Sequence, residues 1–281
     1  MKELNYRSGV TGRNLDLEST DVWLGPARSF RNRVWSYKLG GRGAEQITRD
    51  AREAKLTVEY GSREAMDKAE EQFEADLTAG RPGVISAYTM NDKEWTQNAY
   101  IPLSESTDDR HGLTCDLTIL LLDGVWRHQL PPTDFNTSID ITSGIYLDLP
   151  TDVPYDLKPG SISQKITNPS LTPMPWISHI YGPCTDPYFR IRGNLYQVNC
   201  EVPPDGYLTI TALAGQKSVI LTDAVGGRTD VFAKARRGRG LNGGEYIFQP
   251  IPAGTNEVTW PNTFGFDIAI VQERSTPPWS I

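Results

Sequence analysis

The residues that most often carry out chemistry in proteins are few in this chain and widely spaced. Its 281 residues include three histidines and three cysteines, and none of them stands at a spacing typical of a metal site or a catalytic triad. HxxxH, HExxH, CxxC, GxSxG and Walker patterns are all absent. We therefore expect no metal, no cofactor and no enzymatic activity. The six side chains are His111, His128, His179, Cys115, Cys184 and Cys200.

Pairs of acidic residues offer a route to catalysis that spacing alone does not exclude. Two carboxyl groups can act as the general acid and the nucleophile of a glycosidase, provided that they lie at the right separation in space. A sequence does not show that separation, and acids on an exposed helix or a polar loop are usually just solvated. A hydrolase therefore stays open as an alternative. The pairs are Asp108-Asp109, Glu70-Glu71 and Asp152 with Asp156.

Tryptophan side chains suggest a binding alternative. The chain has seven of them, and flat aromatic rings both stack on sugars and fill the cores of β-sandwiches. Trp176 and Trp260 are the candidates for stacking in a module that binds cell-wall polysaccharide. The sequence leaves sugar binding and core filling equally open.

Charged residues in the first part of the chain suggest contacts between copies. Residues 166–281 hold nine basic and nine acidic side chains, so the net charge of −7 lies entirely in residues 1–165. If the segment around Phe30 is a strand, its arginines form a row that suits pairing with the acids of a neighbouring copy's helix. The candidate interface residues are Arg28, Arg31, Arg33, Glu70, Glu71 and Glu74.

One helix is predicted over residues 62–79. Ser62 can cap its first turn, and Gly80 ends it before Pro82. Apolar residues at spacings of three and four form one stripe, and acids occupy the opposite face. The expected stripe is Ala65, Met66, Ala69, Phe73 and Leu77, and the expected polar face is Asp67, Glu70, Glu71, Glu74 and Asp76.

Most other segments alternate between apolar and polar residues, which is typical of half-buried strands. Turn signals separate them, as in an antiparallel sandwich. The predicted fold class is mainly β, with two antiparallel β-sandwich domains over residues 1–130 and 166–281, joined by a Pro-rich connection over 131–165. We expect no membrane association, because no apolar run approaches the roughly 18 residues that a membrane helix needs, and no secretory signal is evident.

Short motifs in a fixed order cover most of the chain. In the first domain they are Arg33–Trp35, Ala54–Tyr60, Phe73–Leu77, Gly80–Gly83, Trp95, Ala99-Tyr100 and Leu120–Trp126. In the second they are Asn168-Pro169, Tyr181–Pro183, Asp186-Pro187, Asn194–Tyr196, Ile251–Asn256, Glu273-Arg274 and Pro277–Trp279. In this order the sequence resembles the distal tail protein (Dit) family of long-tailed, non-contractile bacteriophages.

The resemblance implies a first domain that closes into a six-fold ring and a galectin-like second domain at the periphery. Such rings join the tail tube to the tail tip or baseplate, leave a channel for DNA and serve as a hub for host-adsorption proteins. The implied partners are further copies, the tail tube protein, the tail tip or tail-associated lysin protein, the tape measure and receptor-binding proteins. The implied location is the virion, after synthesis in the host cytoplasm.

Two features depart from the family pattern. The connection over residues 131–165 has no obvious motif, and the second domain shows no long inserted arm on which receptor-binding proteins could dock. Because like charge keeps DNA from adhering to a channel wall, we further expect acidic residues of the first domain to line the lumen. The alternative function is a carbohydrate-binding module that contacts host cell-wall polysaccharide.

Overall fold

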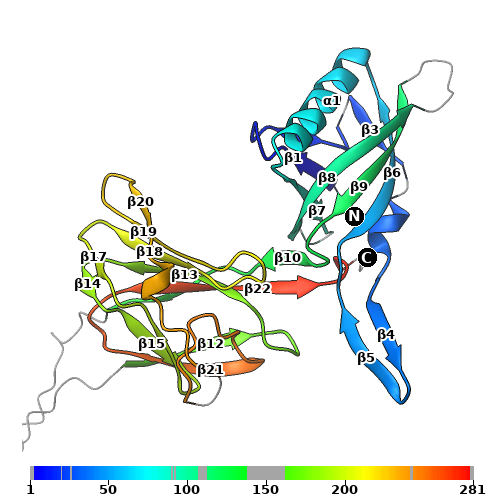
Figure 1. Cartoon of the computed structure of the whole chain (residues 1–281). Helices are drawn as coiled ribbons and strands as arrows, with labels where there is room; N and C mark the ends of the chain where they lie inside the picture. The colour runs from blue at the N-terminus through cyan, green and yellow to red at the C-terminus, as the bar shows by residue number, and fades with distance from the viewer. Residues whose placement is uncertain are drawn as a thin grey trace, which may run out of the picture. The chain divides into compact units, whose positions relative to one another are not determined.

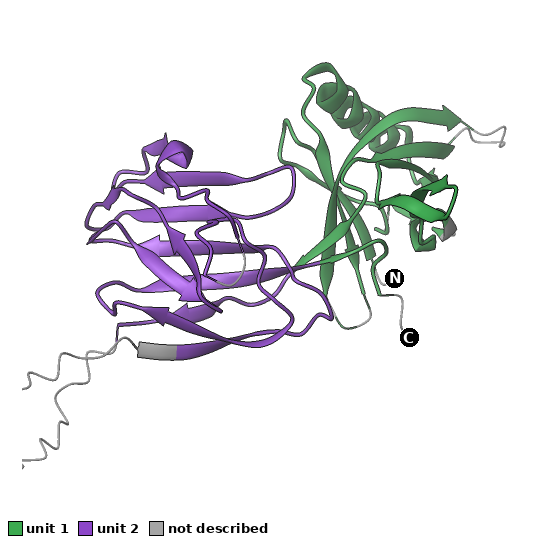
Figure 2. Ribbon diagram, turned by 60° about the horizontal axis from the view of Figure 1, so that its bottom comes forward, with its two compact units in different colours: residues 1–128, 273–281 green, residues 129–272 purple. Residues whose placement is uncertain are grey.

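The computed structural model describes residues 3–19, 21–25, 27–89, 91, 93–106, 113–137, 162–240 and 243–278. The chain forms two compact units, shown in green and purple in Figure 2. Unit 1 contains Met1–His128 and Glu273–Ile281, and unit 2 contains Gln129–Gln272. The end of the chain, expected in the second domain, is therefore grouped with the first unit. The predicted mainly β architecture with antiparallel pairing is confirmed.

The strands of unit 1 form two antiparallel runs that share one long strand, β8 (Glu94–Ser106). The first part of β8 pairs with β7 (Gly83–Tyr88), and its last part pairs with β9 (Thr114–Leu121). The runs are therefore β2-β1-β7-β8 and β3-β6-β9-β8 (Figure 1). The other described strands of unit 1 are β1 (Glu3–Arg7), β2 (Asn14–Asp16), β3 (Val22–Leu24), β4 (Ser36–Gly40), β5 (Gly43–Thr48), β6 (Arg52–Tyr60) and β10 (Trp126–Gln129), the last of which ends in unit 2.

The predicted helix is present as α1 (Arg63–Thr78), and its two end signals act as expected. The Ser62 hydroxyl accepts a hydrogen bond from the Ala65 amide at 3.1 Å, which satisfies one amide of the open first turn. Gly80 has φ +61°, a left-handed conformation that ends the helix at low steric cost. Ala69 and Phe73 are buried among the side chains of unit 1, as the apolar stripe predicts.

The last turn of α1 reverses the predicted faces. Leu77, expected in the apolar stripe, is 37% exposed, whereas Asp76, expected on the polar face, is fully buried. The Asp76 carboxylate accepts hydrogen bonds from the Tyr6 and Ser8 hydroxyls, both at 2.7 Å, and from the Val10 amide at 3.0 Å. Burial, together with the hydrogen bond to Asp76, raises the pKa of Tyr6 above its usual range. The prediction was wrong here because partners from β1 and the loop after it make burial of a carboxylate favourable.

The segment Arg28–Arg31 is a short 3-10 helix and not the strand that the arginine spacing suggested. Phe30 is fully buried and meets the Trp126 ring edge-on, with 6.1 Å between the ring centroids. The Ser29 hydroxyl accepts a hydrogen bond from the Lys55 amide at 3.0 Å and so fixes the turn to β6. Burial of Phe30 therefore sets the path of this segment, and the single row of arginines that a strand would provide does not form.

Unit 2 packs two sheets around one aromatic core. One sheet has the order β22-β13-β18-β19-β20, with β11 on the other side of β22, and the second has the order β12-β21-β15-β16. The strands of unit 2 are β11 (Thr133–Phe135), β12 (Ile162–Asn168), β13 (Trp176–Tyr181), β14 (Cys184–Thr185), β15 (Tyr188–Ile191), β16 (Asn194–Gln197), β17 (Glu201–Val202), β18 (Tyr207–Thr211), β19 (Ser218–Thr222), β20 (Arg228–Asp230), β21 (Gly254–Trp260) and β22 (Phe266–Arg274), the last of which ends in unit 1.

The segment predicted as a connection, residues 131–165, contains strand residues at both of its ends. Strand β11 lies near its beginning, and β12 starts at Ile162. Residues 138–161, which make up most of the connection, lie outside the described residues. Among the described residues, no helix has the length and hydropathy needed to cross a bilayer.

Candidate assembly interface

The residues considered for catalysis do not form a site in the part of the chain that the structure describes. That part contains no group of three or more His, Cys, Asp or Glu side chains able to hold a metal ion. Glu70 is half-buried and Glu71 is exposed on α1. His111 and the other two acidic pairs, Asp108-Asp109 and Asp152 with Asp156, lie outside the described residues.

The two tryptophans proposed for sugar stacking are core residues of unit 2. Trp176 is fully buried and Trp260 is 1% exposed, so neither ring offers a face to a ligand. The Trp176 indole donates a hydrogen bond to the Gln249 carbonyl at 2.9 Å. Rings from both sheets surround these two side chains, and this packing explains why the stacking hypothesis for them was wrong. They are core fillers.

Among the residues of unit 1 that the structure describes, the large apolar side chains with the greatest exposure lie on a hairpin formed by β4 and β5. Among the described strands these two pair only with each other, and Figure 1 shows them extending away from the other strands of unit 1. Tyr37 pairs with Ile47 across the hairpin, and Leu39 lies two residues beyond Tyr37 on the same face. These side chains are 65%, 61% and 70% exposed, respectively. A lone two-stranded hairpin is barely stable in water, so an apolar face of this kind needs a cover.

The base of the hairpin is held by close packing. The Arg49 guanidinium, just after β5, lies over the Trp35 ring, just before β4, at 5.3 Å from the ring centroid. Gly124 approaches the Arg49 backbone so closely that a Cβ at Gly124 would lie 2.3 Å from the Arg49 carbonyl oxygen. Gly124 also has φ +64°, which favours glycine. The two ends of the hairpin are therefore tied to each other and to the turn after β9.

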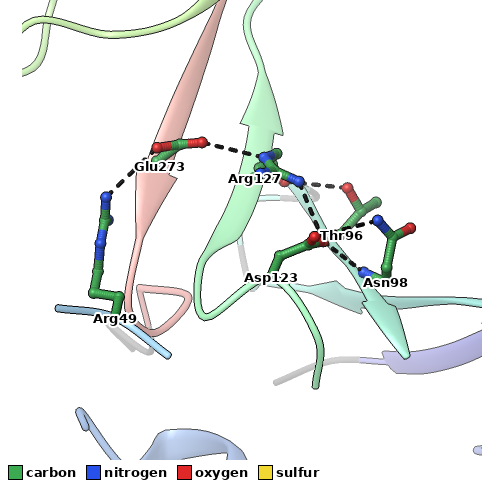
Figure 3. Close-up of polar contacts among 6 residues, drawn as sticks. All are labelled: Arg49, Thr96, Asn98, Asp123, Arg127 and Glu273. Carbon is green, nitrogen blue, oxygen red and sulfur yellow. Dashed lines mark hydrogen bonds and ion pairs between the residues drawn. The ribbon is translucent and has the colours of Figure 1, made fainter. Parts of the chain in front are cut away.

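A network of buried charges continues from this base (Figure 3). Arg49 Nη2 lies 3.5 Å from one Glu273 oxygen, and Arg127 Nε lies 3.2 Å from the other. Arg127 Nη1 lies 3.2 Å from an Asp123 oxygen, which also accepts the Asn98 amide at 3.0 Å. The Arg127, Glu273 and Asp123 side chains are only 10%, 12% and 16% exposed. Arg127 is the member that pairs with both carboxylates, so its removal would leave Asp123 without this cation and Glu273 with only the more distant Arg49. Because breaking a buried ion pair is costly, the network rigidifies the base of the hairpin.

One further contact holds the end of the chain in unit 1, and another joins β8 to β10. The Arg274 guanidinium lies 5.6 Å from the centroid of the Trp95 ring, a cation–π contact on a ring that is almost completely buried. The Thr96 hydroxyl donates to the Arg127 carbonyl oxygen at 3.4 Å. Segments from the first 50 residues, from the middle and from the end of the chain thus meet in one small region of unit 1.

The charged residues proposed for contacts between copies have different surroundings. Arg31 and Arg33 are exposed, as are Glu71 and Glu74, while Glu70 is half-buried. Arg28 lies in the 3-10 helix. Pairing between such arginines and the acids of another copy's helix stays a prediction.

The hairpin was not predicted from the sequence, although a signal for it was present. Tyr37 and Leu39 alternate with polar residues before the glycine-rich turn Gly40–Gly43, and Ile47 follows it. Apolar residues that alternate around such a turn predict a hairpin. Nothing in the pattern says that its apolar face is left exposed.

Comparison with solved structures relates this fold to phage tail proteins. A chain of the phage p2 baseplate, solved in its activated conformation with Sr, matches 98% of this chain and 99% of its own length, with a TM-score of 0.59 and 12% sequence identity. The same baseplate with Ca matches with a TM-score of 0.58. The SPP1 Dit (gp 19.1) protein, described as a paradigm of the hub adsorption apparatus in phages that infect Gram-positive bacteria, matches 96% of this chain and 99% of its own length, with a TM-score of 0.52 and 12% identity.

The chain has the Dit fold. This confirms the fold expected from the resemblance, and it covers both units because the matches span nearly the whole chain. No family model and no curated protein sequence matches the chain. At 12% identity the likeness to Dit lies in the path of the backbone, so side-chain roles have to be argued from this chain alone.

Proposed function

We propose that this protein is a structural component of a bacteriophage tail that closes through unit 1 into a ring, six-fold as the family resemblance implies. The ring joins the tail tube to the tail tip or baseplate and serves as a hub for host-adsorption proteins. The solved proteins of the same fold are baseplate and hub components, which supports a role in tail assembly. The observation that carries the proposal is the anchored hairpin with its uncovered apolar face.

A second copy is the occupant that suits the hairpin best. The Leu39 and Ile47 side chains are 70% and 61% exposed. Burial of each of them against a second copy would stabilise the contact between the two copies by roughly 1–2 kcal/mol. A hairpin on every copy that packs on a different patch of the next copy makes a heterologous contact, which closes into a ring when the rotation allows it. The rigid base keeps the angle of the hairpin constant, and a constant angle is what a closed ring of one size requires.

The channel in this proposal is lined by the outward face of β6, β8 and β9. Residues that alternate with the buried core positions point outward there, and Glu53, Glu59, Glu105 and Asp116 are all exposed. Lys55 is the basic residue between the two glutamates on β6. An acidic wall repels the DNA backbone and lets DNA pass without binding. A ring whose channel is lined by basic or neutral side chains would contradict this assignment.

The remaining partners follow from the position of the ring in the tail. The tail tube protein lies on one side, the tail tip or tail-associated lysin protein on the other, and the tape measure in the channel before ejection. Receptor-binding proteins dock at the periphery. The protein would act in the virion as an assembly component, with no catalytic step.

Light scattering and negative-stain imaging of the full-length chain test the proposal. Closed rings of one size are expected from the wild type. The double variant Leu39→Lys with Ile47→Lys should be monomeric, because it places charge on the contact. The matched control, Leu171→Lys with Val225→Lys, changes side chains in unit 2 that are 99% and 93% exposed and should leave the rings intact. A monomeric wild type, or unchanged rings in the hairpin variant, would contradict the proposal.

A further inference from the structure

The outward face of one sheet in unit 2 carries aromatic and hydrogen-bonding side chains that no role in ring closure uses. On β13, His179 and Tyr181 alternate with the buried Ser178 and Ile180 and so point away from the core. Tyr207 on β18 lies directly opposite Tyr181 in the register. Tyr181 is 47% exposed and Tyr207 is 38% exposed. Two neighbouring tyrosine rings are therefore exposed to solvent on this sheet.

Asp267 on β22 holds this surface in one conformation. Its carboxylate is nearly buried and accepts a hydrogen bond from the Tyr181 hydroxyl at 2.6 Å. It also accepts from the His179 backbone amide at 3.2 Å and faces the His179 ring nitrogen Nδ1 at 3.1 Å. The hydrogen bond from Tyr181 is the main reason that the pKa of this tyrosine is raised to about 12, so Tyr181 stays a donor at neutral pH. The rings of Tyr181 and His179 are thus fixed before any ligand arrives.

The contact with Asp267 also determines the tautomer of His179. A carboxylate only accepts hydrogen bonds, so Nδ1 carries the proton and Nε2 is left as an acceptor in the neutral ring. Within the described residues Nε2 has no hydrogen-bond partner, and the His179 side chain is 36% exposed. Thr209 lies opposite His179 in the register and adds a hydroxyl beside it. The contact with Asp267 also raises the pKa of His179, and in the protonated ring Nε2 is a donor. The face therefore offers a free ring nitrogen and a hydroxyl next to two aromatic rings.

The charge on this surface limits what it can bind. Asp134 on β11 lies opposite Asp267 in the register and is exposed. The described outward positions of β11, β13 and β18, and those of β22 over Phe266–Ile270, include no lysine or arginine. Asp267 is paired with His179, so the exposed Asp134 is the carboxylate that would repel an anionic polymer such as a nucleic acid or a phosphate-rich polysaccharide. In the register row of Tyr181 and Tyr207, a basic side chain follows two strands beyond Tyr207, at the exposed Arg228 on β20.

We propose that this face of unit 2 binds an uncharged saccharide. The ring of a hexopyranose has an apolar C–H face, which packs on exposed tyrosine rings, and hydroxyl groups, which bond to fixed polar groups. Tyr207 and Tyr181 supply the aromatic platform, and His179 Nε2, the Thr209 hydroxyl and Asp134 supply hydrogen-bonding groups at its border. Because hydrogen bonds to Asp267 already order Tyr181 and His179, binding costs little conformational entropy.

A saccharide suits this face better than a protein. The centre of a protein interface is usually apolar and depleted of charge. The centre of this face contains a carboxylate–imidazole pair with tyrosines around it, whereas the strongly apolar hairpin of unit 1 has the composition of a protein contact. The two surfaces consist of different residues in different units, so saccharide binding and ring closure can succeed or fail independently.

Binding is tested with the full-length protein on an array of neutral oligosaccharides of glucose, galactose, mannose, rhamnose and N-acetylhexosamines, with sulfated oligosaccharides as the anionic set. Each neutral probe that gives a signal is then titrated by calorimetry. Saturable binding to a neutral probe is expected, with no binding to the sulfated set. Tyr207→Ala should weaken it about tenfold, since it removes one aromatic platform. The matched control is Tyr188→Ala, because Tyr188 is 36% exposed but lies on β15 in the other sheet.

Hydrogen exchange of the wild type keeps the test independent of whether the variant folds. Addition of the neutral probe should protect peptides from β13 and β18 and leave those from β15 and β16 unchanged. Three outcomes would overturn the proposal: no saturable binding to any neutral probe, equal affinity in Tyr207→Ala and wild type, or protection confined to the other sheet. Loss of binding to a purified tail protein in Tyr207→Ala, with no saccharide bound by the wild type, would assign the face to protein docking and also overturn it. Light scattering of the same samples reports ring formation separately.

Discussion

Replacement of Asp76 by alanine is the sharpest test of how unit 1 is held together. The Asp76 carboxylate is fully buried and accepts hydrogen bonds from Tyr6, Ser8 and the Val10 amide. Removal of the carboxylate leaves the Tyr6 and Ser8 hydroxyls without their acceptor, in surroundings where each unpaired group costs roughly 1–3 kcal/mol. The Val10 amide keeps only its longer contact with the Ser8 hydroxyl, at 3.2 Å. Partial entry of water reduces the sum, so we expect a loss of about 3–5 kcal/mol, the range for disrupting a buried charged group. A loss of this size is a large share of the free energy of unfolding of a typical domain, which is roughly 5–15 kcal/mol.

The neighbouring residue provides the control. Leu77→Ala removes an apolar side chain that the helical pattern places in the core but that is 37% exposed, so its cost should stay below about 1 kcal/mol. Asp76→Asn keeps one acceptor oxygen and the shape of the side chain, and it should fall between the two alanine variants. Replacement of the acid should therefore cost more stability than replacement of the leucine, which is the reverse of what the apolar stripe predicts.

Calorimetry and hydrogen exchange of the full-length chain can measure these effects. We expect Asp76→Ala to lower the melting temperature by roughly 10 °C or more, the shift that such a loss produces in a domain of this size. Faster exchange should appear in peptides from β1 and α1, which the carboxylate joins, and not in peptides from unit 2. If Asp76→Ala melts within about 2 °C of Leu77→Ala, roughly the effect of less than 1 kcal/mol, the proposed role of this buried carboxylate is wrong.

Two further predictions concern charged groups in the two units. Arg127→Met should destabilise unit 1 by roughly 3–5 kcal/mol, because it leaves the buried Glu273 carboxylate without its closer cation, whereas Lys68→Met, which removes an exposed ion pair, should have little effect in the same thermal melts. In unit 2, the hydrogen bond to Asp267 raises the pKa of His179, so the stabilisation from this pair is complete below the unfolded value near 6.5 and is lost as the pH rises through the higher folded value. Burial raises the pKa of Asp267, but the hydrogen bonds from His179 and Tyr181 and the charge of His179 together outweigh it, and the net pKa is lowered. This contribution is therefore lost as the pH falls into the acid range. Melting temperatures between about pH 5 and 8 should fall toward the alkaline end, and His179→Gln should flatten that slope; a wild-type slope identical to that of the variant would contradict the assignment.

Local signals in the sequence were sufficient to predict individual elements. The alternation over Ala54–Tyr60 predicts β6, and Ser62 with Gly80 predicts the two ends of α1, because strand periodicity and helix capping depend on residues close together in the chain. Tyr196, Val198, Cys200 and Val202 also alternate with polar residues, which predicts one continuous strand over residues 196–202, but this prediction is wrong. The structure divides it into β16 and β17, although all four apolar residues that alternate there are buried.

The candidate site was predicted far less well than the elements. Trp176 and Trp260 are as compatible with a sugar site as with a core when only their residue type is known, and the packing of two sheets around them decides the question. Conversely, Tyr37, Leu39 and Ile47 have a pattern that ordinarily indicates a half-buried strand, yet no other strand of the described chain pairs with their hairpin.

The sequence by itself determined that this protein is a β-rich chain with one capped helix, because those properties arise from neighbouring residues through backbone sterics and the periodicity of side-chain direction. Only the tertiary structure decided which side chains are exposed: it buried Asp76, brought Arg49, Arg127 and Glu273 together, and left the hairpin and the tyrosine face open to solvent. Burial depends on which distant segments meet, and the free energy of a charge or an apolar ring depends on what surrounds it more than on its own type.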